Sequence, residues 1–286
     1  MFNDWQTASA MQLVEIKNEL GSAMVSLMGA HVISYKKANS EDILWMSDQS
    51  YMEYGKPIRG GIPVCWPWFG PHPDKERKLP SHGLGRIALW DVKEKTECPD
   101  GSSKLVLTLP GSRLPDEFSA LDAEIEIIVG SSLKMNLKTT NNGEKDYDLT
   151  QALHTYFNVS DAEAITVEDL DSLVYLDTVT NEYGIQYGPL KIDREIDRIF
   201  RTCGSTRIID PGFNRIIHID KYGSNSTVVW NPWIDKSKRM PDFGDEEYHT
   251  MLCVEAAKVP KFGDEGVVSS GMIYELRQVI RVENIE

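Results

Sequence analysis

The chain of 286 residues carries a formal net charge of −14, and 41% of its residues are hydrophobic, which suffices for a large core. This acidic balance disfavours nucleic acid and anionic membranes as partners, because both bind broad basic surfaces. No run approaches the roughly 18 uninterrupted apolar residues that a membrane-spanning helix requires, so we expect no membrane segment.

The chain opens with MFNDWQTASAMQL, which lacks the basic start and the apolar run of a secretory signal. We therefore expect a cytoplasmic protein. In segments 23–27 and 105–109 apolar residues recur at every second position, a pattern typical of half-buried strands.

Further apolar segments continue this pattern, and turn signals such as Asn142-Gly143 and Pro211-Gly212 lie near their ends. These strand candidates are 123–130, 131–140, 214–220, 226–230 and 250–257. The final segment 272–284 suits either a helix or a strand, and its β-branched residues favour a strand. Because helical periodicity is scarce, the sequence predicts an all-β antiparallel sandwich, in a single domain over residues 1–286.

Two segments interrupt the strand pattern. Residues 55–86 are rich in Gly and Pro, but they also contain Trp66 and Trp68, which makes a solvated linker improbable. Residues 231–249 form a second loop, of mixed charge and with aromatic residues. Long ordered loops on β scaffolds usually carry function, so we expect both loops to border one cleft.

Arg59 and Arg86 lie in the first of these loops, next to glycines that allow a ligand to approach the backbone closely. A planar guanidinium can bind phosphate through paired, charge-assisted hydrogen bonds, and two arginines would hold a dianion. The alternative is that each arginine forms an ordinary surface salt bridge.

His154 follows a strand-like run and lies among apolar and aromatic residues, where an imidazole could transfer protons near neutral pH. Alternation in segment 250–257 places Glu255 on one strand face with Met251 and Cys253, and a carboxylate among apolar residues is paired or functional. The alternatives are a structural histidine and an exposed glutamate at a strand end. Asp197 taken alone suggests a local ion pair with Arg198.

Neither a metal site nor a disulfide framework is expected from local spacing. The four cysteines form no C-x-x-C pair, and the six histidines form no H-x-H, H-x-x-x-H or H-E-x-x-H pattern. A metal-dependent isomerase of the cupin type would need clustered histidines, which the sequence lacks.

Six motifs occur in a fixed order between residue 59 and about residue 257: RGGIPVCWPWFGP, HGLGR followed by a Trp, LHTYFNVSD, EIDRIF, WNPW and MLCVEAA. In this order they resemble the glucose-6-phosphate 1-epimerase (hexose-6-phosphate mutarotase) family. The resemblance implies the galactose mutarotase-like β-supersandwich of antiparallel sheets, a hexose 6-phosphate as partner, and neither metal nor organic cofactor. We also expect a monomer.

The same resemblance implies roles for single residues. The catalytic histidine of the family falls on His154 and its catalytic glutamate on Glu255, as general acid and general base. The sugar- and phosphate-contacting positions fall on Arg59, Ser81, His82, Arg86 and Asp197. The chain departs from many relatives at Leu84 and Gly85, where those relatives carry Phe and Ala. Ser81 occupies a position at which some relatives carry Gln.

The expected reaction is therefore interconversion of the α and β anomers of a hexose 6-phosphate, with His154 starting protonated and Glu255 starting ionised. Two other functions remain open on the sequence alone. The chain could be an epimerase of unphosphorylated aldoses, which would use the same acid and base. It could also be a non-catalytic module that binds sugar phosphates.

Overall fold

The computed structural model describes residues 11–259 and 266–285. The first ten residues, where the sequence predicts no secretory signal, lie outside the described part. Among the described residues, no helix has both the length and the apolar character needed to cross a membrane.

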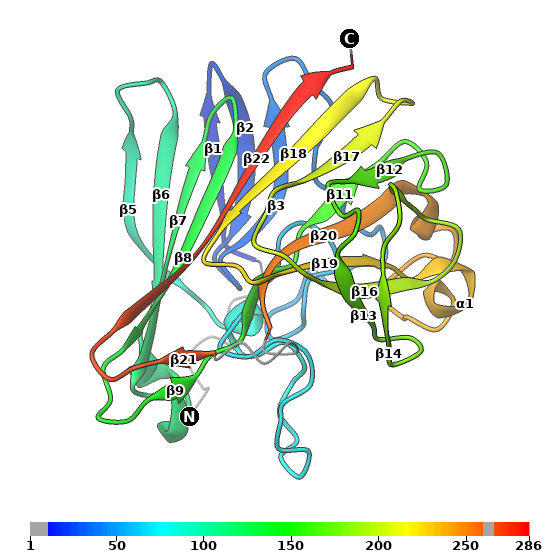
Figure 1. Ribbon diagram of the computed structural model, residues 1–286. Coiled ribbons are helices and arrows are strands. Elements are labelled where there is room, and N and C mark those ends of the chain that lie inside the picture. The colour runs from blue at the N-terminus through cyan, green and yellow to red at the C-terminus, as the bar shows by residue number, and fades with distance from the viewer. Residues whose placement is uncertain (1–10, 260–265, 286) are drawn as a thin grey trace.

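Strands dominate the described chain, and they form two large sheets (Figure 1). The nine-stranded sheet has the order β15 (Leu190–Lys191), β12 (Thr166–Glu168), β17 (Thr206–Asp210), β18 (Arg215–Tyr222), β22 (Ile273–Asn284), β8 (Leu133–Asn141), β7 (Leu121–Val129), β6 (Ser103–Leu109) and β5 (Asp91–Glu97). The eight-stranded sheet has the order β14 (Glu182–Ile185), β13 (Val174–Asp177), β16 (Ile196–Arg201), β19 (Ser226–Asn231), β20 (Met251–Lys258), β10 (Gln151–Leu153) and β4 (Val64–Cys65), and β11 (Tyr156–Asn158) pairs with β20.

Smaller elements complete the architecture. A three-stranded sheet contains β1 (Leu13–Asn18), β2 (Gly21–Ser26) and β3 (His31–Lys37), and β9 (Tyr147–Asp148) pairs with β21 (Val267–Val268). The helical elements are α1 (Trp233–Ser237) and four 3₁₀ turns: η1 (Gly85–Ile87), η2 (Gly111–Arg113), η3 (Asp116–Phe118) and η4 (Glu247–Thr250).

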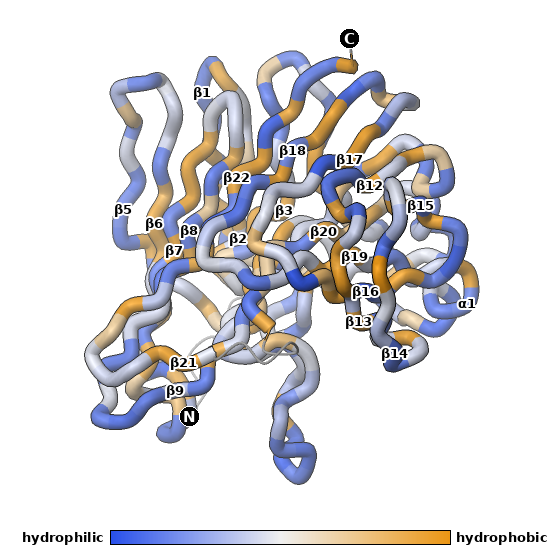
Figure 2. Tube along the Cα trace, viewed as in Figure 1, coloured by the Kyte–Doolittle hydropathy of each residue, from blue (hydrophilic) through white to orange (hydrophobic). Residues whose placement is uncertain are grey.

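The predicted fold class is confirmed, because the model is nearly all β and its sheets are antiparallel. Each of the strand candidates named from the sequence forms a strand, and the ambiguous final segment forms the long strand β22. In β7 and β8, buried positions alternate with exposed or half-buried ones, which is the period-two pattern of a sheet with one face on the core. Figure 2 shows the same alternation as orange and blue along these strands.

β20 differs from these strands because all eight of its residues are buried. Leu252 and Val254 belong to the large core that also contains Leu276 and Ile280 of β22. Cys253 packs on the other face with an aromatic cluster that includes Trp230 and Tyr156. One face of this central strand therefore contacts the large core, and the other packs on residues of loop 231–249 such as Phe243 and Tyr248.

Very close backbone contacts fold loop 55–86 back on itself. Gly83 has a φ of +75°, and a Cβ added there would lie 2.1 Å from the carbonyl oxygen of Trp66. The amides of Leu84 and Gly85 both donate hydrogen bonds to that same oxygen, at 2.8 Å. Only glycine fits a backbone approach of this kind.

We predict that Gly83→Ala lowers the free energy of unfolding by about 1–3 kcal/mol, because the new methyl group must displace the backbone of Trp66. Gly188→Ala is the matched control: its φ is +67°, but an added Cβ would meet no atom within 4 Å. Urea denaturation of both variants separates the steric clash from the cost of a positive φ. Equal losses in the two variants would contradict the assigned clash.

Candidate active site

His154 and Glu255 lie together although they come from distant parts of the chain. Glu255 belongs to β20, and His154 directly follows β10, which pairs with β20. The amide of His154 donates to the carbonyl of Pro63 at 3.0 Å, which fixes the backbone at this point. His154 Nε2 lies 3.4 Å from Glu255 Oε1, and the two residues are 8% and 1% exposed.

Burial shifts both groups toward their neutral forms. Desolvation lowers the pKa of His154 well below its usual value, and the nearby His82, Arg59 and Arg86 lower it further. Desolvation likewise raises the pKa of Glu255 well above its usual value, with a smaller contribution from Asp197. The pair therefore favours an uncharged state in which its one transferable proton lies on the carboxyl group. This differs from the sequence-based expectation of a protonated His154 and an ionised Glu255 at the start.

Aromatic rings fix the orientation of the imidazole. The ring of Tyr156 stacks on His154 with centroids 4.9 Å apart and an interplanar angle of 8°. His82 and Trp230 contact His154 edge-on, at 5.6 Å and 6.1 Å between centroids. Since the imidazole has few polar contacts, this packing determines where its nitrogens point.

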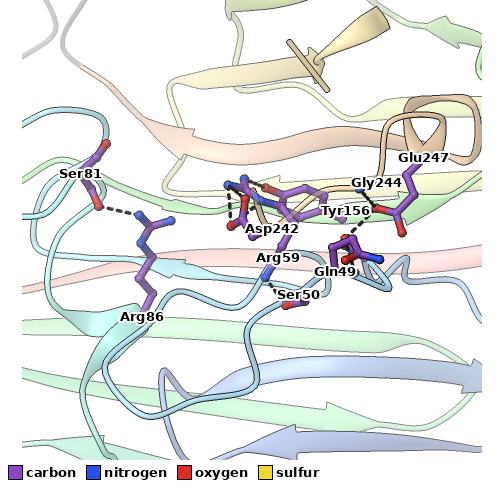
Figure 3. A network of polar contacts seen from close by, with 10 residues as sticks. Gln49, Ser50, Arg59, Ser81, Arg86, Tyr156, Asp242, Gly244 and Glu247 are labelled. Atoms are coloured by element: carbon purple, nitrogen blue, oxygen red, sulfur yellow. Dashed lines mark hydrogen bonds and ion pairs between the residues drawn. The ribbon is translucent and has the colours of Figure 1, made fainter. Parts of the chain in front are cut away.

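Arg59 donates hydrogen bonds to two neighbouring side chains, Asp242 and Tyr156 (Figure 3). Its Nε and Nη2 donate to both carboxylate oxygens of Asp242 at 3.0–3.2 Å, and its Nη1 donates to the Tyr156 hydroxyl at 2.9 Å. The guanidinium is thus paired with a carboxylate and also holds the phenol that stacks on His154.

Arg86 has a different environment. Its Nη2 donates to the backbone carbonyl of Ser81 at 2.8 Å, while its Nε is buried without a hydrogen-bond partner. Within the described residues, no carboxylate forms a salt bridge with Arg86. Desolvation lowers the pKa of Arg86, as expected for a cation that burial has left without a close counter-charge.

The ring of His82 can act as a hydrogen-bond donor through Nε2. The amide of Gly70 donates to His82 Nδ1 at 3.2 Å, so the hydrogen of the neutral ring lies on Nε2. Desolvation, together with Arg86 and Arg59, lowers the pKa of His82 to about 3, which keeps the ring neutral at physiological pH.

Asp197 points to the same face of the sheet as Glu255. It lies opposite Trp230 of β19, which in turn lies opposite Cys253 of β20. Burial raises the pKa of Asp197, and Lys236, 3.8 Å away, opposes this shift. The alternative of a local Asp197–Arg198 ion pair is wrong, because Arg198 points to the opposite face and pairs with Asp177.

The structure therefore brings His154, Glu255, His82 and the two arginines close together, with Asp197 two strands from Glu255, on β16. We infer that these side chains line a cleft. Three buried atoms in this cleft have no hydrogen-bond partner among the described residues: His154 Nδ1, Glu255 Oε2 and Arg86 Nε. A polyhydroxylated ligand with an anionic group would satisfy such atoms. One group of possible metal ligands occurs in the described chain, Asp161, Glu163 and His249, and it contains none of these residues.

The sequence analysis missed three residues of this cleft. Tyr156 lies two positions after His154 in the motif LHTYF, and this spacing on an extended chain could have indicated that it shares a face with the histidine. Asp242 and Lys236 lie in loop 231–249, where nothing in the local sequence distinguishes them from other charged residues.

A family model described as aldose 1-epimerase matches residues 12–281. Two curated relatives are each named "Putative glucose-6-phosphate 1-epimerase". The one from Escherichia coli K12 is 35% identical over 256 residues, covering 86% of this chain and 83% of the relative. The one from Cenchrus ciliaris is 32% identical over 270 residues, covering 90% of this chain and 81% of the relative. A crystal structure of a "putative mutarotase" from Salmonella typhimurium superposes with a TM-score of 0.86 at 27% identity, covering 97% of this chain and 92% of that one.

We predict that Glu255→Gln stabilises the fold, and by more at pH 8 than at pH 5. A raised native pKa means that the folded state keeps a proton that the unfolded state has lost, so the carboxyl group costs stability as pH rises above its unfolded pKa. Glutamine removes this cost. Urea denaturation of the wild type and the variant at both pH values measures it, and a destabilised variant at pH 8 would indicate a stabilising ion pair instead.

Proposed function

The chain belongs to the aldose 1-epimerase family, and on this basis we propose that it interconverts the α and β anomers of D-glucose 6-phosphate or a related hexose 6-phosphate. The names of the curated relatives support the phosphorylated substrate. The observation that carries the proposal is the buried pair of His154 and Glu255, whose nitrogen and oxygen lie 3.4 Å apart in a cleft that also contains two arginines.

The proposed reaction requires only proton transfers. Moving the proton of the pair from Glu255 to His154 gives the carboxylate and the imidazolium. Glu255 then takes the proton of the anomeric hydroxyl, the C1=O double bond forms, the bond from C1 to the ring oxygen breaks, and His154 protonates that oxygen. Rotation about the C1–C2 bond turns the aldehyde, and the reverse transfers close the ring on the opposite face.

The other residues of the cleft bind and orient the substrate in this proposal. The substrate-binding residues are Arg59, Ser81, His82, Arg86 and Asp197. His82 donates from Nε2 to a sugar oxygen, and Asp197 accepts from a hydroxyl. Ser81 contributes its carbonyl oxygen to the position of Arg86, a contact that does not depend on the length of its side chain. Holding both ends of the sugar converts the proton transfers into steps within a single complex.

We propose no cofactor, since the two side chains supply and accept every proton that the reaction moves. We further propose a single-domain, monomeric, cytoplasmic enzyme. The free thiols of Cys65, Cys98, Cys203 and Cys253 are consistent with a reducing compartment.

Magnetisation-exchange NMR tests the activity directly. The protein is expected to accelerate exchange between the α and β anomers of glucose 6-phosphate above the spontaneous rate, and to do so more strongly than for free glucose. Equal acceleration for both sugars would favour an epimerase of unphosphorylated aldoses. Binding of the sugar phosphate without acceleration would favour a non-catalytic module.

We predict that His154→Gln and Glu255→Gln each lower kcat by about 10²- to 10⁴-fold, the range typical of one general acid or base. The chain offers a matched control in His218 and Glu283, a second histidine–glutamate pair, 2.9 Å apart on strands β18 and β22. His218→Gln and Glu283→Gln should keep kcat within threefold of the wild type in the same exchange measurement. A wild-type rate in either cleft variant would contradict the assigned roles.

A further inference from the structure

His154 lies where the hydrogen-bond ladder along β20 is interrupted. Strands β10 and β11 pair with β20 in one continuous register, which places His154 opposite Glu255 and Thr155 opposite Val254. The amide of Val254 donates to the carbonyl oxygen of Thr155 at 3.2 Å. The Thr155 amide, which would return this bond in a regular ladder, donates instead to the carbonyl oxygen of Leu153 at 2.9 Å. This contact closes a γ-turn with His154 at its centre, so the direction of the imidazole depends on how the turn is held.

The side chain of Thr155 reaches from this turn to the nine-stranded sheet. Its hydroxyl donates to Gln278 Oε1 at 2.7 Å, and Gln278 belongs to β22. Both residues are buried, Thr155 at 0% exposed and Gln278 at 1%. The hydrogen bond therefore connects the turn at His154 directly to the opposite sheet.

The Thr155–Gln278 bond lies among apolar side chains. Leu276 and Ile280 flank Gln278 on the same face of β22 and belong to the large core. Gln278 Nε2 is buried without a hydrogen-bond partner among the described residues. A polar pair in this position costs desolvation free energy that an apolar pair would avoid. What the hydrogen bond adds is direction, because it fixes the rotamer of Thr155 and with it the backbone next to His154.

Two sets of contacts then position the imidazole. The ring of Tyr156 stacks on it and sets its plane. The γ-turn sets the point and direction at which the side chain leaves the backbone. On one side the turn is held by the carbonyl of Pro63, which accepts from the amide of His154 at 3.0 Å. On the other side it is held by the hydroxyl of Thr155 through Gln278.

We propose that Thr155 and Gln278 are positioning residues, whose hydrogen bond fixes the γ-turn and so aims the imidazole of His154 at Glu255. The proposal rests on the proposed function, because it takes His154 as a proton-transferring group. Thr155 and Gln278 meet on the side of β20 that contacts the large core, away from the substrate. They therefore act on the rate of proton transfer and not on the binding of the sugar phosphate.

The test uses the double variant Thr155→Val/Gln278→Met, which removes the bond without leaving one partner buried and unpaired. In the magnetisation-exchange measurement its kcat should fall about 10- to 100-fold, since a small misplacement of a catalytic group is costly, while its KM stays within threefold. Thr155→Ser keeps the hydroxyl and should keep kcat within threefold of the wild type. If circular dichroism shows that the double variant is unfolded, Gln278→Met alone replaces it, because the Thr155 hydroxyl can then turn to the carbonyl of Leu153, 3.4 Å away.

Tyr35→Phe is the matched control for a general loss of stability. It also removes a buried hydroxyl, one that donates to the carbonyl of Gly130 at 2.9 Å, and it should leave kcat unchanged. A kcat that falls in Tyr35→Phe as far as in the double variant would show that lost stability is the cause, and it would overturn the positioning role.

A second measurement does not depend on turnover. In a proton–carbon NMR spectrum, the Cε1–H signal of His154 is identified by its loss in His154→Gln, and the stacked ring of Tyr156 shifts it. The double variant should move this signal, and Thr155→Ser should leave it in place. Either an unmoved signal or a wild-type kcat in the folded double variant would overturn the proposal. A wild type that does not accelerate anomer exchange would contradict the proposed function, and the His154 signal alone would then decide whether the bond positions the imidazole.

Discussion

The site depends on one constraint: the carboxyl group of Glu255 on the central strand β20 is buried beside the imidazole of His154, which directly follows the paired strand β10. β20 is buried on both faces, so Glu255 can point only into the core or toward the packed loops. Desolvation then raises the pKa of Glu255 and lowers the pKa of His154. Both shifts favour the neutral form of each group, and the proposed ring opening and reclosure need proton transfer in both directions.

A buried pair with unsatisfied atoms needs other means of holding its geometry. His154 Nδ1 and Glu255 Oε2 have no hydrogen-bond partners among the described residues, so packing rather than polar contact positions the imidazole. The ring of Tyr156 stacks flat on the imidazole, and the Tyr156 hydroxyl in turn accepts a hydrogen bond from Arg59. A ligand that contacts Arg59 would therefore act on the same side chain, Tyr156, that orients the imidazole of His154.

Much of the fold could be predicted from the sequence, because apolar residues recur at every second position in strands that bury one face. The same rule placed Glu255 with Cys253 on one strand face. The rule does not predict strand pairing, so the contact between Glu255 and His154, which depends on β10 pairing with β20, came only through the family resemblance. Alternation also explains why the local pairing of Asp197 with Arg198 is wrong, since neighbours on a strand point to opposite faces. The Arg59–Asp242 pair joins two loops that have no periodicity, so no local pattern indicates it.

The proposed proton-transfer residues lie on or beside strands, whereas most of the proposed binding residues lie in loops. His154 and Glu255, the proposed acid and base, sit on or directly beside the eight-stranded sheet, where a change of position would disturb the core on the other face. Arg59, His82 and Arg86 all lie in loop 55–86, which close contacts at glycines hold to the sheets: a Cβ added to Gly61 would lie 2.3 Å from the carbonyl oxygen of Val32. Asp242 reaches this loop from the second one. Charge beside the His154–Glu255 pair can therefore change through single loop residues, while this proposed acid and base stay fixed by the sheet.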